Sequence, residues 1–109
     1  DGLFTLKAAG AIHLHNSFEL PKLRVVVEDD AVPFVREGKN TFAKFVLECH
    51  EEFRPYDEAL IVDKKDELIA VGQCRMNREE MLSFRKGIAV KTREGVKLKL
   101  LHENTHTAS

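Results

Sequence analysis

The stretch Ala59-Leu60-Ile61-Val62-Asp63-Lys64-Lys65-Asp66-Glu67-Leu68-Ile69-Ala70-Val71-Gly72 decides the fold. Two apolar runs of strand length, 59–63 and 68–72, are joined by a polar turn at 63–67. The length and polarity of this turn suit a β-hairpin, because lysine and acidic side chains stay in water there. The sequence therefore predicts a pair of adjacent strands in the middle of the chain.

Further strand-like runs lie on both sides of this hairpin. They span residues 23–27, 42–49, 88–90 and 96–100. Two short helices are predicted among them, at 31–37 and 78–86. The expected order is strand, helix, three strands, helix, two strands. Strands dominate, which favours a mainly β (α+β) fold, a small closed or half-closed barrel, over a doubly wound parallel sheet.

Both predicted helices carry terminal signals. Pro33 falls in the first turn of the first helix, where its missing N–H costs little, and Gly38 stands where a left-handed stop is expected. Asn77 followed by Glu80 has the pattern of a capping box at the start of the second helix. Gly87 is expected to end that helix.

Length and composition indicate one domain. The chain has 109 residues and 12.4 kDa, with 43% hydrophobic residues, enough for a single core. Turn formers between residues 16 and 22 suggest a linker. We therefore expect an appendage at 1–22, which suggests the end of a preceding domain in a longer protein, then a main domain from residue 23 to 101 and a flexible tail at 102–109.

Several function classes are disfavoured. No apolar run approaches the roughly 20 residues of a membrane span, so we expect no membrane partner and a cytoplasmic location. The two cysteines, Cys49 and Cys74, match no metal spacing and suggest a reducing setting. Cys49 is expected to be buried beside an exposed His50. With no phosphate-binding loop and no convincing catalytic cluster, we expect neither catalysis, nor a cofactor, nor a metal site.

Charge is unevenly distributed although the net charge is only -1. The cations of two segments outnumber the acids there, and they are Arg36, Lys39, Lys44, Arg85, Lys86, Lys91, Arg93, Lys97 and Lys99. Acidic residues collect instead at 28–30 and 48–58. This polarity would direct a phosphate backbone to one side of the domain. The alternative, at even odds from periodicity alone, is that these cations merely coat the solvent face of strands.

Five motifs in one consistent order carry a resemblance to a known family. They are Pro33-Phe34-Val35-Arg36-Glu37-Gly38-Lys39-Asn40, Phe42-Ala43-Lys44-Phe45-Val46, Arg54-Pro55-Tyr56-Asp57-Glu58, Leu68-Ile69-Ala70-Val71-Gly72 and Gly87-Ile88-Ala89-Val90-Lys91. Together, from about Leu23 to Val96, they resemble a PUA domain, in the form that ends archaeal archaeosine tRNA-guanine transglycosylases. The resemblance implies a pseudobarrel of about six strands with two short helices.

The resemblance also implies a function. The module would bind RNA in tRNA modification, most specifically archaeosine formation, and hold the tRNA acceptor stem and 3′ end for a separate catalytic domain or subunit. The alternative is a protein-interaction or dimerisation module, in which apolar residues of segment 1–22, Ile12 among them, form an uncovered face and the chain forms a homodimer. The same module occurs in archaeosine synthase, pseudouridine synthases and ribosome-associated proteins, and the sequence does not cleanly separate these parents.

The residues expected to contact RNA follow from the matched motifs and the basic segments. They are Arg36, Gly38, Lys39, Asn40, Phe42, Lys44, Arg85, Lys86, Gly87, Lys91 and Arg93. The two glycines would let backbone N–H groups approach phosphate or ribose, and the cations would hold phosphates. Phe42 is a candidate for stacking on an unpaired base, although Phe34, Phe42, Phe45 and Phe84 are first expected in the core. Arg75 and Arg78 add two cations at a place unusual for the family.

Overall fold

The structure is a computed structural model that describes residues 12, 15 and 24–96. Its central feature is the predicted hairpin, formed by the antiparallel strands β4 (Glu58–Val62) and β5 (Leu68–Cys74). Asp63 fixes the turn, because its carboxylate accepts hydrogen bonds from the amides of Lys65 at 2.8 Å and Glu67 at 2.9 Å. The side chain thus replaces the backbone partners that a tight turn leaves unpaired.

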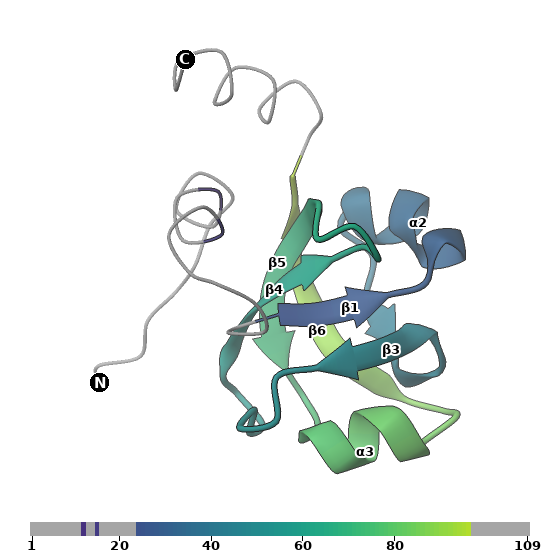
Figure 1. Ribbon diagram of the computed structural model, residues 1–109, viewed down its shortest axis with the longest axis vertical. Coiled ribbons are helices and arrows are strands. Elements are labelled where there is room, and N and C mark those ends of the chain that lie inside the picture. Colours follow the sequence, from purple (N-terminus) through teal and green to yellow (C-terminus); the bar gives the residue numbers. More distant parts are fainter. Residues whose placement is uncertain (1–11, 13–14, 16–23, 97–109) are drawn as a thin grey trace.

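Six strands form one sheet in the order β2-β6-β5-β4-β1-β3. Strand β1 (Arg24–Val27) runs parallel to β4 and antiparallel to β3 (Val46–Cys49). Strand β6 (Ile88–Gly95) pairs antiparallel with both β5 and β2 (Thr41–Phe42). The outer strands β2 and β3 are joined directly by the 3₁₀ turn η2 (Ala43–Phe45), so the sheet curls into a nearly closed barrel (Figure 1). The mainly β pseudobarrel is therefore confirmed.

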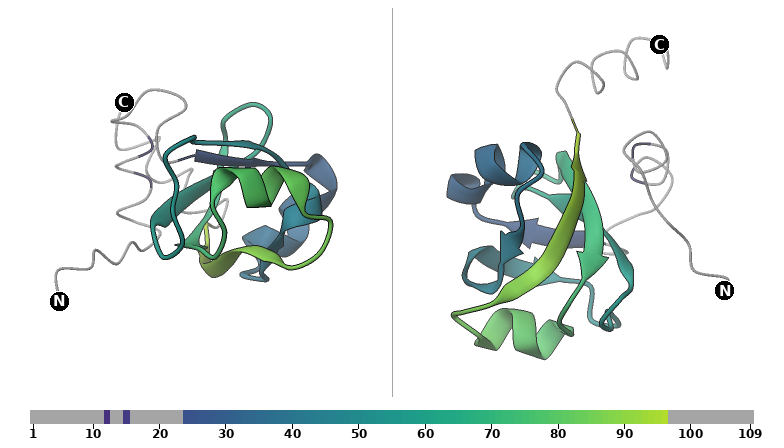
Figure 2. Two further views of the ribbon diagram at one scale, coloured as in Figure 1. Left: turned by 90° about the horizontal axis from the view of Figure 1, so that it is seen from below. Right: turned by 180° about the vertical axis from the view of Figure 1, so that it is seen from behind.

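Short helices cover the openings of this barrel. The 3₁₀ turn η1 (Asp29–Ala31) leads into α2 (Val32–Arg36), which packs against β5 and β6. Helix α3 (Arg78–Ser83) packs against β3 and η2 and closes the lower end in Figure 1, as the two views of Figure 2 also show. Its predicted capping box is present: Asn77 accepts from the Glu80 amide and Glu80 accepts from the Asn77 amide, both at 2.9 Å.

Apolar side chains gather on both sides of the hairpin. The larger cluster fills the barrel and includes Val25, Val35, Ile61, Ile69 and Val90. The smaller cluster lies on the other side and consists of Ile12, Leu60, Val62, Leu68, Val71 and Val96, with Val26 beside it. Ile12 is only 3% exposed, so this member of the predicted uncovered face is covered by the chain's own hairpin. The other residues predicted for that face lie outside the described residues.

Three element predictions need correction. The single strand expected at 42–49 is β2, η2 and β3, because the chain must turn from one edge of the sheet to the other. Helix α3 ends at Ser83, before the expected Gly87, since Phe84 adopts an extended ψ of 139°. Strand β6 continues from 88 to 95 where a strand at 88–90 was expected. The strand expected at 96–100 lies almost wholly outside the described residues.

The predicted positions of the aromatic residues and of His50 also differ. Phe34, Phe42 and Phe84 are exposed, and Phe45 is half-buried, although all were first expected in the core. Cys49 is buried as predicted, but His50 is only half-buried and its ring lies edge-on to Phe53. Aromatic residues outside the barrel matter for the surface described next, since they can contact a ligand.

Candidate nucleic-acid interface

Two glycine-containing loops, far apart in sequence, meet at one edge of the barrel. Strand β2 pairs with the start of β6, with Phe42 opposite Ile88, and the Ala43 amide donates to the Gly87 carbonyl at 3.0 Å. This pairing places residues 38–44 beside residues 85–91. We call these two segments together the glycine-loop surface. It contains both glycines and seven other residues that the sequence predicted as RNA contacts.

Both glycines adopt a left-handed backbone, with φ of 98° at Gly38 and 95° at Gly87. At Gly38 the amide donates to the Val35 carbonyl at 2.9 Å, and the next amide, of Lys39, donates to Phe34 at 3.1 Å. These are the two bonds of a Schellman helix stop. The Gly38 and Lys39 amides are therefore already used, so phosphate binding in this loop depends on side chains.

A cluster of exposed cations surrounds these loops. Lys39 is 66% exposed, with its ammonium 5.6 Å from the Phe34 ring centroid and 4.0 Å from a Glu37 carboxylate oxygen. Lys44 lies 5.1 Å from the Phe45 ring centroid. Arg85, Lys86 and Lys91 are exposed and form no ion pair with any described residue. These charges are available to an anionic ligand.

Two predicted arginines have partners inside the domain. Arg36 is 17% exposed and donates to the Val96 carbonyl at 2.7 Å, with Glu67 at 3.4 Å. Arg93 makes a bidentate pair with Glu58, which is 11% exposed. Arg36 therefore joins α2 to the end of β6, and Arg93 joins β6 to β4. Their charges are compensated, which separates them from the exposed lysines as candidate RNA contacts.

Asn40 and Phe42 complete the predicted set. Asn40 is half-buried in the loop before β2, and the Phe42 side chain is 43% exposed at the end of β2. The neighbouring Thr41 is fully buried, where its hydroxyl lies 3.1 Å from that of Thr92 on β6. This inward contact holds β2 against β6 and turns Phe42 outward.

The cysteines have the properties of core residues. Burial raises the pKa of the Cys49 thiol to about 11 and raises that of Cys74 further. A thiol that stays protonated at neutral pH is neither a ready nucleophile nor a metal ligand. Within the described residues, no group of three His, Cys, Asp or Glu side chains could hold a metal ion.

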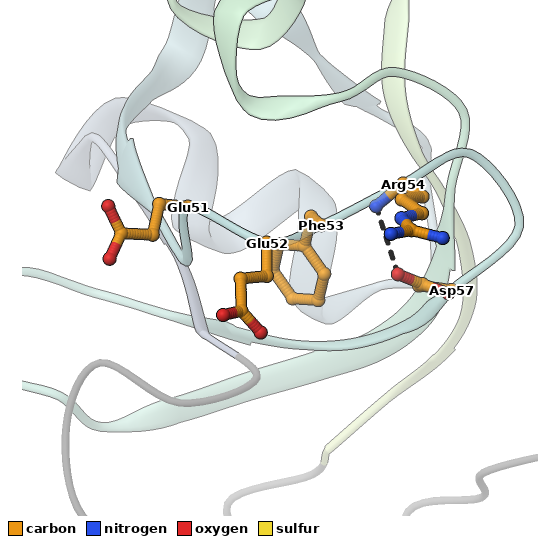
Figure 3. Close-up of a pocket in the computed structure, with 5 residues that line it drawn as sticks. All are labelled: Glu51, Glu52, Phe53, Arg54 and Asp57. Carbon is orange, nitrogen blue, oxygen red and sulfur yellow. Dashed lines mark hydrogen bonds between the residues drawn. The ribbon is translucent and has the colours of Figure 1, made fainter.

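Acidic side chains gather on a different part of the molecule. The loop between β3 and β4 forms a pocket lined by Glu51, Glu52, Phe53, Arg54 and Asp57 (Figure 3). The dashed line in Figure 3 marks the Arg54 amide donating to the Asp57 carboxylate at 2.9 Å. This pocket matches the acidic segment 48–58 of the sequence. Glu58 of the same segment instead pairs with Arg93 of a basic segment, so the acidic and basic segments are not fully separated.

Sequence reasoning singled out Arg75 only as an unusual cation and did not select Tyr56. In the structure the Arg75 guanidinium lies 5.5 Å from the centroid of the exposed Tyr56 ring. A tyrosine inside a turn motif, Arg54-Pro55-Tyr56-Asp57, was the signal that could have drawn attention to this pair.

A nearly closed six-stranded barrel with exposed cations on paired edge loops defines a small pseudobarrel module. Comparison with known proteins is consistent with that class. The chain belongs to the PUA domain family, whose model matches residues 23–96. No helix among the described residues is long and apolar enough to cross a membrane.

Curated relatives are longer proteins. The chain is 54% identical over 96 residues to tRNA-guanine(15) transglycosylase of Thermococcus onnurineus, covering 88% of this chain and 17% of that protein. It is 47% identical over 98 residues to the protein of the same name from Methanocaldococcus jannaschii, covering 90% of this chain and 15% of the relative. The chain thus corresponds to less than a fifth of either relative.

Solved structures share the fold. A hypothetical protein from Pyrococcus horikoshii aligns with a TM-score of 0.74 at 24% identity, over 91% of this chain and 61% of that one. A chain in a structure of an H/ACA RNP bound to a substrate RNA aligns with a TM-score of 0.65 at 32% identity, over 68% of this chain and 23% of that one. The second likeness is to a component of an RNA-protein complex.

Proposed function

We propose that this chain is a non-catalytic RNA-binding module of a tRNA-modifying system, with archaeosine formation as its process. The meeting of the two glycine loops carries this proposal, because it concentrates Lys39, Lys44, Arg85, Lys86 and Lys91 along one edge of the barrel. Cations held along an edge can follow a phosphate backbone, which is the main source of affinity for nucleic acids. The relatives named tRNA-guanine(15) transglycosylase supply the biological setting.

The module's role is to hold the tRNA acceptor stem and 3′ end while a separate catalytic domain or subunit reaches its target base. The exposed lysines and arginines contact phosphates of the stem, and Phe42 offers a ring for an unpaired base at the end. Arg36 and Arg93 act mainly by holding the loops in place, since each already has partners within the domain. Gly38 and Gly87 set the shape of the two loops.

The experiment is a titration of labelled tRNA, with and without its terminal CCA, into this chain across a series of salt concentrations. We expect binding that weakens with salt and weakens further when CCA is removed. Equal affinity for both tRNAs would remove the 3′ end from the proposal and leave the stem. An absence of binding at low salt would overturn RNA binding by the chain and favour the docking alternative.

A further inference from the structure

Tyr56 occupies a backbone conformation that a tyrosine rarely adopts. Its φ is 77°, in the left-handed region that favours glycine, and its side chain is 60% exposed. Burial therefore does not repay the backbone strain, which for a non-glycine residue costs about 1–2 kcal/mol. A strained, exposed aromatic residue held in one place is a reason to look for a ligand.

Backbone hydrogen bonds hold Tyr56 in this position. Its amide donates to the Cys74 carbonyl at 2.6 Å, and the Cys74 amide donates to the Asp57 carbonyl at 2.7 Å. The turn is closed by Arg54, whose carbonyl accepts from the Asp57 amide at 3.1 Å. The ring is thus presented from a turn tied to the end of β5, so little conformational entropy would be lost when a ligand stacks on it.

Arg75 forms the second half of this feature. Its guanidinium lies 5.5 Å from the Tyr56 ring centroid, and it forms no ion pair with any described residue. The Arg75 guanidinium therefore lies over one face of the Tyr56 ring, and both residues are exposed to solvent. We call these two residues the stacking pair.

The stacking pair continues the glycine-loop surface. The Arg75 amide donates to the Ala89 carbonyl at 2.7 Å, and Lys91 lies opposite Gln73, two residues before Arg75. Arg75 directly follows Cys74, the last residue of β5, and Arg75 and Lys91 are both exposed. Met76 reaches the other loop, because a Cβ at Gly87 would lie 2.8 Å from its Cε.

We propose that the stacking pair binds an unpaired nucleotide of the RNA, with the base stacked on Tyr56 and the phosphate beside Arg75. This inference rests on the proposed RNA binding and adds a site to it. Unpaired bases stack on aromatic rings and guanidinium planes, and the stacking tolerates any base. The acidic pocket of Glu51, Glu52 and Asp57 begins at the next residue and repels phosphate there (Figure 3), so the RNA backbone runs along the Lys91 side.

The chain offers a direct probe of this site, because Tyr56 is its only tyrosine and it has no tryptophan. Intrinsic tyrosine fluorescence therefore reports on Tyr56 alone. We would titrate an RNA hairpin that carries a single-stranded 3′ overhang, and the same hairpin with a blunt end. We expect the overhang RNA to quench the fluorescence and the blunt RNA to leave it unchanged.

Three variants complete the test. Tyr56→Gly relieves the left-handed strain and removes the ring, so we expect a folded protein with about tenfold weaker binding of the overhang RNA and an unchanged salt slope. Tyr56→Phe keeps a stacking ring and should bind as the original chain does. Arg75→Gln should weaken binding and lower the salt slope by about one.

The outcomes separate the two proposals. If the original chain binds neither RNA at low salt, RNA binding itself fails. If both RNAs bind but the overhang RNA leaves the tyrosine signal unchanged and Tyr56→Gly binds as tightly as the original chain, the stacking pair is wrong and RNA binding stands. Loss of binding in Tyr56→Phe as well as in Tyr56→Gly would also overturn stacking, because it would assign the effect to the hydroxyl group.

Discussion

Lys91 is the residue on which the phosphate contacts can be tested most simply. It is exposed on β6 and forms no ion pair with any described residue, so its removal breaks no ion pair there. We expect Lys91→Ala to keep its stability and to bind tRNA more weakly, with a salt slope lower by about one for the lost phosphate contact.

The matched control for this prediction is Lys64→Ala, which removes the same charge from the exposed hairpin turn. That variant should bind tRNA as the original chain does. An unchanged slope for Lys91→Ala would take Lys91 out of the interface. Binding isotherms at four or more salt concentrations give both slopes.

The two thiols allow a pH-dependent prediction. Burial raises the pKa of Cys49 to about 11 and raises that of Cys74 as well. The thiols of an unfolded chain have a pKa of about 8.5. The unfolded chain therefore loses these protons first, and the free energy of unfolding should fall as pH rises from the ordinary thiol range toward about 11. Below the ordinary thiol range, both thiols are protonated in the folded and the unfolded chain, so they do not make the free energy of unfolding depend on pH.

Thiol chemistry supplies the measurement. At pH 8 we expect a disulfide reagent such as dithionitrobenzoate to label neither cysteine in the folded chain and both in denaturant. The control is Cys49→Ala, which should leave one reactive thiol after unfolding. Rapid labelling of the folded chain would mean that one of these side chains reaches solvent.

Single residues also mark where sequence reasoning succeeded and where it did not. Gly38 was predicted to stop a helix, and it does so. This was predictable because the stop needs a residue with positive φ, and glycine adopts that conformation most easily. The exposure of Phe34 and Phe84 was not predicted, and that of Phe42 was expected only in its alternative role as a stacking residue. The neighbouring residues do not indicate whether an aromatic side chain faces into or out of the barrel, since its burial depends on strands distant in sequence.

At the scale of elements, Gly95 decides how closely α2 approaches β6. A Cβ at Gly95 would lie 1.6 Å from the Arg36 carbonyl oxygen, a contact with rigid backbone. We expect Gly95→Ala to lower the free energy of unfolding by about 3 kcal/mol, because helix and strand must separate to relieve the overlap.

Gly38→Ala is the matched comparison, since a Cβ at Gly38 would meet nothing within 4 Å and only its left-handed φ of 98° would be strained. Its cost should be about 1 kcal/mol. Urea unfolding of the two variants gives the difference. Equal costs would mean that backbone conformation, and not the contact between α2 and β6, accounts for both glycines.

The elements themselves were predictable where one segment carries its own signal. The polar turn at 63–67 and the capping box at Asn77 both appear in the structure as the sequence indicated. The division of 42–49 into β2, η2 and β3 was missed. That break follows from barrel closure, because the chain must cross from one edge of the sheet to the other, and periodicity within eight residues does not contain this information.

At the scale of the whole molecule, the charge distribution follows the topology. Segments 36–44 and 85–93 meet through β2 and β6, while the acidic loop lies between β3 and β4. The sequence predicted the basic and acidic segments but not which cations have internal partners. Arg36 on α2 pairs with Glu67 of the hairpin turn, and Arg93 on β6 pairs with Glu58 on β4. Such pairs depend on which segments the fold brings together.

The start of the described chain is attached to the hairpin. Arg24 is 2% exposed and donates to the His15 carbonyl at 2.9 Å and to the Asp66 carboxylate at 3.2 Å. His15 Nε2 lies 2.6 Å from the Asp66 carbonyl oxygen. Ile12 belongs to the same buried cluster as Leu60 and Leu68 of the hairpin. Two residues of segment 1–22 therefore contribute to the stability of the barrel.

This attachment gives a prediction that also separates stability from RNA binding. Ile12 is 3% exposed, so Ile12→Ala leaves a cavity over the hairpin and should lower the free energy of unfolding by about 2–4 kcal/mol. The glycine-loop surface is built on the loop after α2, on β2 and η2, on the loop after α3 and on the start of β6, none of which carries Ile12. Below its unfolding transition, the variant should therefore bind tRNA with the affinity and salt slope of the original chain. Urea unfolding and tRNA titration of the same preparation test both parts. An unchanged free energy of unfolding would show that the Ile12 side chain does not stabilise the hairpin. A folded variant with weakened tRNA binding would place segment 1–22 in the RNA interface.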